Sequence, residues 1–440
     1  MLVLFNNGIQ AVVGLATTYV LYHYLSIVET GMYYFVLSFV GLCEAGRYGF
    51  LATATVKFYA GTDKERGQTV LGSVWLLAIF LSVIIMLING VGLLLLPYTN
   101  NPELILCIKW IGITYLSTLP ADVIFWRLQA EEKYAKMFLY RMLNGITTII
   151  AFIILVMLHR FTLETALIWN FLTNCIASLI GILWNFSGLK TIVHRSRDCV
   201  MEIFHYGKYT FVTTSISSIL ANADIWIINF IFGPVLGPTY VAVYNLANRF
   251  MQFVDLPLRT FITTGMSEMA ISYNKKNMQQ VTYIYKKYTG MLTLAFIPFN
   301  LIIFGVGIVA IKIIGGPQYN GPMLLQIIGA YGLLLIISVS YPIDRFNGLA
   351  LDIIHKTKVN SYKVIIMLVV KIATGLLFAW LLKNIYGIVI STFLMTIAAI
   401  FYGYYQLRKS LDFTIPGILS LGYTELKVLI RKTLKLTAKT

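Results

Sequence analysis

The sequence predicts an all-α membrane protein with about twelve transmembrane helices. Three observations support this prediction. The composition is too apolar for a soluble protein, apolar runs long enough to cross a bilayer follow one another along the chain, and lysine and arginine are unevenly distributed between alternate connections. An internal repeat then arranges the expected helices into two lobes of six.

Composition excludes an ordinary soluble protein. Hydrophobic residues make up 58% of the 440 positions and charged residues only 12%, whereas a soluble protein of this length needs more polar surface to stay dispersed. The hydrocarbon core of a bilayer is about 30 Å thick and takes about 20 residues of helix. A dozen spans with short connections therefore account for the chain, and no room remains for a large soluble domain.

The apolar runs predict where the spans lie. The first run lacks a basic start and a small-residue cleavage site, and another apolar run follows directly, so we expect a span there rather than a secretory signal. The expected spans cover residues 3–26, 31–56, 68–96, 103–127, 139–159, 164–188, 209–232, 238–262, 288–314, 322–346, 360–382 and 385–407.

The basic residues predict the orientation. With the N-terminus inside, the connections on the outer face hold only Arg160, Lys312 and Lys383, and the other connections hold many more. This is the positive-inside pattern, which predicts that both termini are cytoplasmic. The net charge of +16 is then a matter of topology, and we expect no nucleic-acid partner.

The pattern of apolar and basic residues in the C-terminal tail, residues 411–440, predicts a basic amphipathic helix. We expect it to lie on the anionic lipids of the inner leaflet rather than to form a thirteenth span, because Glu425 and the basic residues would oppose insertion. A solvated tail is the alternative. The apolar positions are Leu426, Leu429, Ile430 and Leu434, and the basic ones are Lys427, Arg431, Lys432 and Lys435.

A weak internal repeat divides the chain into an N-terminal lobe at residues 1–195 and a C-terminal lobe at residues 201–410. The turn before Tyr33 resembles the turn before Tyr240, each with a small residue or a proline two positions earlier. Further along, Pro120-Ala121-Asp122 is matched by Pro342-Ile343-Asp344. Six spans per copy make the repeats parallel, an arrangement that places a site between the lobes near the middle of the membrane.

Signatures of catalysis and of cofactors are missing. The segment from Gly316 to Gly321 resembles a phosphate-binding loop, but proline follows it where lysine would be required. The five histidines are scattered without metal-ligand spacing, and the four cysteines lack CxxC spacing. We therefore expect no enzyme, no metal and no cofactor, and we expect Na⁺ or H⁺, the membrane potential or the substrate's own gradient to drive any transport.

Three segments resemble a known family. Residues 221–250, ANADIWIINFIFGPVLGPTYVAVYNLANRF, resemble the hairpin of spans 7 and 8 in polysaccharide flippases of the multidrug/oligosaccharidyl-lipid/polysaccharide (MOP) exporter superfamily. LSIVETGMYYFVLSF resembles that family's turn between spans 1 and 2, and EAGRYGFLATATVKFYA resembles the end of its span 2. The resemblance covers about residues 1–410.

The resemblance implies a fold and a function. The fold is a V-shaped bundle of two lobes. The function is to move an undecaprenyl-pyrophosphate-linked oligosaccharide from the inner to the outer leaflet of a bacterial cytoplasmic membrane, for surface polysaccharides such as O-antigen. The partners implied are the lipid-linked oligosaccharide and polysaccharide-assembly enzymes.

Charged residues inside spans are the candidate site residues, because an ionised group at the bilayer centre costs roughly 2.5 to 3.5 kcal/mol on insertion scales. Arg249 lies about 16 Å below the turn at Pro238 and has no acidic residue three or four positions away. It either binds a phosphate or forms a structural pair with another helix. Asn245, Gln252 and Arg259 share its helical face, although Arg259 can also pair with Asp255, four positions earlier.

The other intramembrane charges leave alternatives open. Arg47 either contributes to the substrate site or forms an intrahelical pair with Glu44, and Lys371 is expected to be a cavity cation near mid-depth. Asp224 is either a proton or sodium site or the counter-charge of Arg249. Asp122 lies near the inner end of its span, where contact with lipid headgroups is expected.

The excess of buried cations favours an anionic cargo. Guanidinium binds phosphate oxygens bidentately, and the amides of residues such as Asn245 and Gln252 suit a sugar. A cation-coupled multidrug exporter of the same superfamily is the main alternative, and an acidic cavity would distinguish it. A membrane polysaccharide polymerase or ligase is less favoured, because such enzymes carry a long outer loop and every outer connection here is short.

Overall fold

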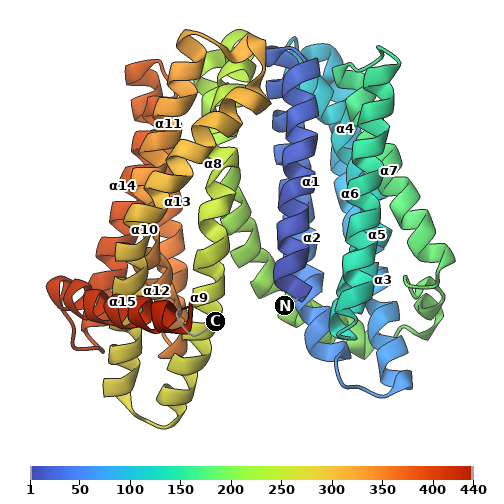
Figure 1. Cartoon of the computed structure of the whole chain (residues 1–440). Coiled ribbons are helices and arrows are strands. Elements are labelled where there is room, and N and C mark those ends of the chain that lie inside the picture. Colours follow the sequence, from blue (N-terminus) through green and yellow to red (C-terminus); the bar gives the residue numbers. More distant parts are fainter. Residues whose placement is uncertain (1, 438–440) are drawn as a thin grey trace. The chain divides into compact units, whose positions relative to one another are not determined.

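The computed structural model describes residues 2–437 and the side chains of residues 10–429 and 431. Helices joined by short connections form nearly all of this part of the chain, and it contains no strand (Figure 1). The helices are α1 (Leu2–Tyr24), α2 (Ile27–Tyr59), α3 (Lys64–Leu95), α4 (Pro102–Ser117), α5 (Leu119–Ala130), α6 (Tyr134–Met157), α7 (Leu163–Leu183), α8 (Arg197–Arg249), α9 (Met251–Asn274), α10 (Met278–Gly315), α11 (Pro322–Ser338), α12 (Tyr341–Ile353), α13 (Thr357–Leu382), α14 (Tyr386–Arg408) and α15 (Ile415–Thr437), with short 3₁₀ turns η1 (Leu96–Tyr98), η2 (Leu189–His194) and η3 (Pro317–Tyr319).

Each of the twelve expected spans corresponds to helical structure. Eight of the described helices are long and apolar enough to cross a membrane, and two bent pairs raise the number to ten. The first expected span lies in α1. The seventh and eighth both involve α8, because this helix is interrupted at Gly233 (φ 69°, ψ −176°). The predicted all-α membrane fold is confirmed.

Contacts divide the chain into two compact units. Unit 1 comprises residues 1–242 and 314–318, and unit 2 comprises residues 243–313 and 319–440. The first part of α8, the expected seventh span, thus packs with unit 1, whereas the repeat assigns it to the C-terminal lobe. The lobe boundaries at residues 195 and 201 stay a prediction.

The core of unit 1 lies between α2, α3 and α5. Leu51 of α2, Val74 and Trp75 of α3, and Val123 and Trp126 of α5 are almost fully buried in one cluster. The indole nitrogen of Trp75 also donates a hydrogen bond to the Ser187 carbonyl oxygen at 2.9 Å, which fixes the connection after α7 to this core.

Two bent helix pairs occupy matching positions in the expected repeat. The pair α4–α5 bends by 40° and the pair α11–α12 by 43°. Pro120 and Pro342 lie in the first turn of the second helix of each pair, where proline lacks the amide hydrogen that would continue the preceding helix. The bends therefore support the match between Pro120-Ala121-Asp122 and Pro342-Ile343-Asp344.

The two turns that the repeat compares lie against each other in unit 1. A Cβ atom on Gly31 of α2 would come within 1.8 Å of the carbonyl oxygen of Pro238. Only glycine allows this approach. The side-chain amide of Gln318 donates hydrogen bonds to the carbonyl oxygens of Tyr22 at 2.6 Å and Leu25 at 2.8 Å, which ties the 314–318 segment to α1.

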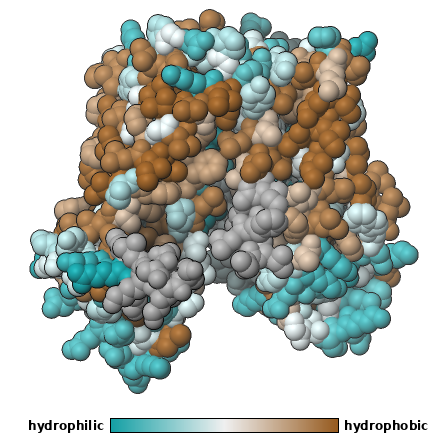
Figure 2. Space-filling view, in the orientation of Figure 1, coloured by the Kyte–Doolittle hydropathy of each residue, from teal (hydrophilic) through white to brown (hydrophobic). Residues whose placement is uncertain are grey.

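The surface pattern agrees with a membrane-embedded protein. Figure 2 shows apolar residues gathered along the helices, and hydrophilic residues gathered at the ends that carry the α2–α3 and α9–α10 turns. Both turns belong to connections that the charge pattern assigns to the inner side. The inner side itself stays a prediction.

The tail forms a helix, α15, that begins earlier than the expected stripe. Its start packs on α10, because a Cβ atom on Gly290 would lie 2.0 Å from the Ile418 carbonyl oxygen. Glu425 accepts a hydrogen bond from the Tyr283 hydroxyl at 2.6 Å. The side chains of the tail positions Ile430, Lys432, Leu434 and Lys435 lie outside the described residues.

The topology is tested by labelling single cysteines in a variant without the four native cysteines. We expect Lys275→Cys to be labelled by an impermeant reagent only after the membrane is permeabilised, because the α9–α10 turn is basic. Asn100→Cys and Asn320→Cys should react in intact cells. All three positions are exposed, so a reversed pattern would contradict the predicted orientation.

Candidate functional site

Arg249 is held at the last turn of α8 by buried neighbours. Leu246 and Ala247 are fully buried, and Phe250 is 4% exposed. The Phe250 ring packs edge-on against Tyr331 of α11, with ring centroids 5.9 Å apart. Because these residues anchor the end of α8 within unit 2, the backbone from which the Arg249 side chain extends is fixed.

The Arg249 guanidinium is half-buried and forms no hydrogen bond or ion pair among the described residues of unit 2. Gln252, on the same face, is exposed, and Asn245 is half-buried. Arg259 is exposed and is not paired with Asp255, so the pair considered from the sequence is not formed. This face therefore presents two guanidinium groups and the exposed amide of Gln252 to a ligand, with Asn245 beside them.

Arg47 is placed differently from either alternative drawn from the sequence. It is 1% exposed, and its Nη2 lies 2.6 Å from Oδ2 of Asp122 in α5, whereas the described residues contain no ion pair between Arg47 and Glu44. It also donates to the Tyr115 carbonyl oxygen at 2.9 Å and to the Thr118 hydroxyl at 2.6 Å. Four hydrogen bonds, counting Nε to Asp122, leave little capacity for a substrate.

The expectation that Asp122 contacts headgroups is corrected by the same pair. The bend at Pro120 marks the start of α5, and Asp122 lies in the first turn of this helix. There its carboxylate compensates the buried guanidinium. An unpaired cation at this depth would be far costlier than the pair.

Unit 2 contains a second buried pair that the sequence did not predict. Lys363 of α13 is 4% exposed, and its ammonium lies 2.8 Å from Oδ1 and 3.0 Å from the carbonyl oxygen of Asp344 in α12. Asp344 follows Pro342 as Asp122 follows Pro120. The matched motif was the one available signal, since it pointed to the carboxylate but not to its cation.

The remaining predicted residues lie inside the units. Lys371 of α13 is 2% exposed and donates a hydrogen bond to the Thr392 hydroxyl of α14, so it lies between two packed helices of unit 2. Asp224 of α8 is 8% exposed within unit 1. Sequence depth was a good guide to burial, but it did not distinguish a cavity wall from a packed interior.

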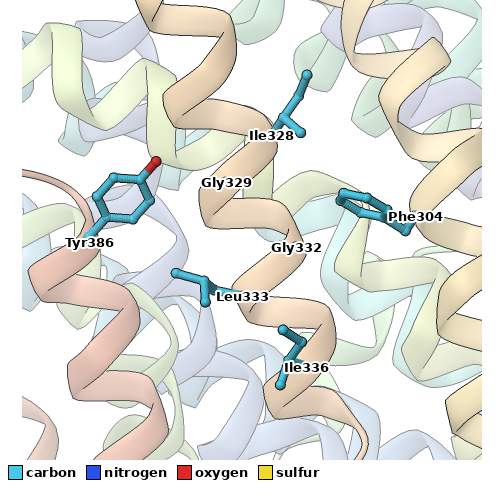
Figure 3. Close-up of a pocket in the computed structure, with 7 residues that line it drawn as sticks. All are labelled: Phe304, Ile328, Gly329, Gly332, Leu333, Ile336 and Tyr386. Carbon is cyan, nitrogen blue, oxygen red and sulfur yellow. The ribbon is translucent and has the colours of Figure 1, made fainter.

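An apolar pocket of about 510 Å³ lies along α11 in unit 2. Figure 3 shows Phe304 of α10 on one side of α11 and Tyr386 of α14 on the other, and Gly329 and Gly332 leave the helix surface between them low. The pocket contains no charged residue, so its chemistry suits a hydrocarbon chain and not a phosphate. Its lining residues are Phe304, Ile328, Gly329, Gly332, Leu333, Ile336 and Tyr386.

A polar pocket of about 360 Å³ lies in unit 1, at the start of α3. Arg127 lines it and donates hydrogen bonds to the carbonyl oxygens of Asn185 and Phe186, each at 3.1 Å. Lys64 and Lys190 also line it. Gly188 adopts φ 60° at its edge, a left-handed conformation that glycine accepts without strain.

A charged network around Glu131 fixes two residues that line this pocket, Tyr59 and Arg127. Glu131 accepts hydrogen bonds from Lys133 at 2.6 Å, the Tyr59 hydroxyl at 2.7 Å and Arg127 at 2.8 Å. Partial burial acts to raise the pKa of the Glu131 carboxyl, but these three hydrogen bonds outweigh it and lower the pKa to about 2. The carboxylate therefore stays ionised at any physiological pH and holds Arg127 in place.

Comparisons with known proteins agree with the fold. The model of one family, described as polysaccharide biosynthesis protein, matches residues 20–324. No curated protein matches the chain. Among solved structures, the chain is similar to an inward-facing multidrug resistance MATE family transporter of the MOP superfamily, with a TM-score of 0.75 and 16% identity over 92% of this chain and 96% of that one.

Two further structures have the same architecture. The lipid II flippase MurJ in an inward closed conformation gives a TM-score of 0.69 at 16% identity, over 98% of this chain and 92% of that one. A MOP superfamily transporter from Pyrococcus furiosus gives 0.63 at 17%, over 93% and 94%. At these identities the likeness shows the fold, and it confirms the MOP-type bundle predicted from the sequence.

The buried pair of unit 2 is tested by removing one partner or both. Asp344→Asn should lower the stability of the purified protein by about 3 to 5 kcal/mol, because it leaves the Lys363 ammonium buried without a counter-charge. Adding Lys363→Met should recover part of this loss in thermal unfolding. Arg66→Gln, in an exposed pair with Glu202, is the control and should cost about 1 kcal/mol or less. A double variant no more stable than Asp344→Asn would contradict the account.

Proposed function

Because the chain belongs to the family of polysaccharide biosynthesis proteins and has the fold of MOP-superfamily transporters, we propose that it is a flippase for a lipid-linked oligosaccharide. The cargo is an undecaprenyl-pyrophosphate-linked oligosaccharide. The protein moves it by alternating access from the inner to the outer leaflet of the bacterial cytoplasmic membrane, for surface polysaccharide synthesis.

The observation that carries the proposal is the contrast between the intramembrane cations. Arg47, Lys363 and Lys371 each donate hydrogen bonds to side chains of their own unit. Arg249 is fixed by its neighbours and has no such partner in the described part of unit 2. A half-buried guanidinium without a counter-charge is costly unless a ligand supplies one.

A pyrophosphate is the ligand that fits this guanidinium. Arginine binds phosphate oxygens through two parallel hydrogen bonds, and charge-assisted hydrogen bonds contribute about 1.5 to 3 kcal/mol. Arg259 adds a second cation, and Gln252 and Asn245 supply amides for the sugar. In this proposal Lys371 adds positive charge at depth rather than a direct contact, whereas the charge of Arg47 is compensated by Asp122.

Substitution of Arg249 tests the proposal. Arg249→Ala should slow transport about tenfold to a hundredfold, the equivalent of one charge-assisted hydrogen bond. Arg249→Lys should retain part of the activity, because the charge remains but the bidentate geometry is lost. Movement of a pyrophosphate-linked oligosaccharide across proteoliposomes is the measurement, with surface polysaccharide in cells as a second readout.

Arg408→Ala, at an exposed position in the last turn of α14, is the matched control and should leave transport unchanged. Normal insertion and thermal stability must accompany each loss. Wild-type transport by Arg249→Ala would remove Arg249 from the substrate site. Transport of cationic drugs without transport of the lipid-linked oligosaccharide would favour the multidrug exporter.

Asp224 is proposed as the residue that couples transport to an ion. A buried carboxylate within a span is suited to carry a proton or a sodium ion. Asp224→Asn keeps the shape but cannot change charge, so transport should lose its dependence on pH or on sodium. Measuring the transport rate against imposed gradients of each ion decides this, and an unchanged dependence would exclude Asp224.

A further inference from the structure

Glu103 occupies a position where a carboxylate is normally exposed. It is the second residue of α4, after the N-cap Asn101 and Pro102, and an acidic residue in a first turn usually faces water near the positive end of the helix. Glu164 has the same place in α7, after the N-cap Thr162, and is exposed. Glu103, however, is fully buried in unit 1.

The buried carboxyl has a single hydrogen-bonding partner among the described residues. Its Oε2 accepts a hydrogen bond from Nδ2 of Asn229 in α8. Its other oxygen, Oε1, has none, and the side-chain oxygen of Asn229 has none either. The backbone amide of Glu103 donates its hydrogen bond to the side-chain oxygen of Asn101 at 3.0 Å, so it is not available to the Glu103 carboxyl.

No cation compensates Glu103. It takes part in none of the ion pairs of the described chain. Beyond Arg66, α3 carries no charged or titratable side chain. Several titratable groups lie near this end of α4 or on the elements around it: Glu29, Tyr33 and Tyr34 of α2, Tyr98 of η1, Cys107 and Lys109 of α4, Glu164 of α7, and Asp224 and Tyr240 of α8.

The energetics favour the neutral acid. Burying an ionised carboxylate costs several kcal/mol even after relaxation. The helix N-terminus returns about 0.3 to 1 kcal/mol and one charge-assisted hydrogen bond about 1.5 to 3 kcal/mol, while Oε1 would remain unsatisfied. A proton on Oε1 removes the charge and turns this oxygen into a donor. The protonated Oε1 then needs an acceptor. The side-chain oxygen of Asn229 can provide it, because the nitrogen of the same amide already donates to Oε2.

We propose that Glu103 and Asn229 form a proton-binding site in which Glu103 carries a proton at neutral pH. A carboxylic acid and a primary amide are complementary, each offering one donor and one acceptor. The single proton therefore satisfies both unpartnered oxygens, whereas the ionised form would bring three acceptor oxygens together with one amide group.

The site lies beneath the turn that ends the first part of α8. A Cβ atom on Gly237 would come within 2.3 Å of Asn229 Oδ1, and the helix is interrupted at Gly233. Pro238, which follows Gly237, packs on Gly31 of α2. Loss of the proton would force the Asn229 amide to turn or water to enter, and either change loosens the 233–238 turn. Protonation is thus linked to the packing of this turn.

Infrared spectroscopy of the purified full-length protein tests the proton directly. At neutral pH, Glu103→Gln should remove one carboxylic-acid C=O band that shifts in heavy water, whereas Glu164→Gln, the matched first-turn control, should leave the spectrum in this region unchanged. Glutamine has the shape and donor of the neutral acid, so we expect Glu103→Gln to fold. A spectrum that loses no acid band would overturn the proposal.

Hydrogen exchange of residues 225–240 tests the link to the turn. After correction for the intrinsic effect of pH, wild-type exchange should rise as the pH increases and the proton leaves, and the Glu103→Gln protein should stay protected. Equal pH dependence in both proteins would contradict the link. If sodium protects the wild type and not Glu103→Gln, and no acid band is found, the site binds a cation rather than a proton.

Discussion

The fold depends on how charges and open backbone groups are compensated where no water is available. Each bent pair leaves carbonyl oxygens without the amides that an unbroken helix would supply. At the α4–α5 bend, Arg47 donates to the Tyr115 carbonyl oxygen and also pairs with Asp122. At the α11–α12 bend, Asn300 donates to the Leu335 carbonyl oxygen at 2.8 Å. The bends persist because side chains from neighbouring helices satisfy them.

This requirement separates two kinds of intramembrane cation. One kind has its donors used by its own unit, as Arg47 and Lys363 do, and removing either would leave a buried carboxylate uncompensated. The other kind is fixed by packing yet lacks an acidic partner in the described part of its unit, as Arg249 does. Only the second kind has hydrogen-bonding capacity to offer the anionic cargo that we propose.

The same requirement applies to carboxyls, and protonation is a second way to meet it. Asp122 and Asp344 each have a cation within 2.8 Å as a counter-charge. Glu103 has an amide instead, so neutrality is the cheaper state. In the proposed site, the partner of a carboxyl therefore decides its charge: the aspartates have cations and Glu103 has a proton. The Asn229 partner of Glu103 lies close against Gly237, so the turn there has little room to adjust.

The sequence by itself determined the all-α membrane class and the family, because hydropathy and local motifs are properties of short segments. It also pointed to Arg249 as a candidate, because the lack of an acidic residue three or four positions away is a local feature. Tertiary structure alone decided that Arg47 pairs with Asp122, that Lys363 pairs with Asp344, and that Glu103 is buried while Glu164 is exposed. These outcomes depend on which helices pack together, and spacing along a single helix carries no information about partners on another.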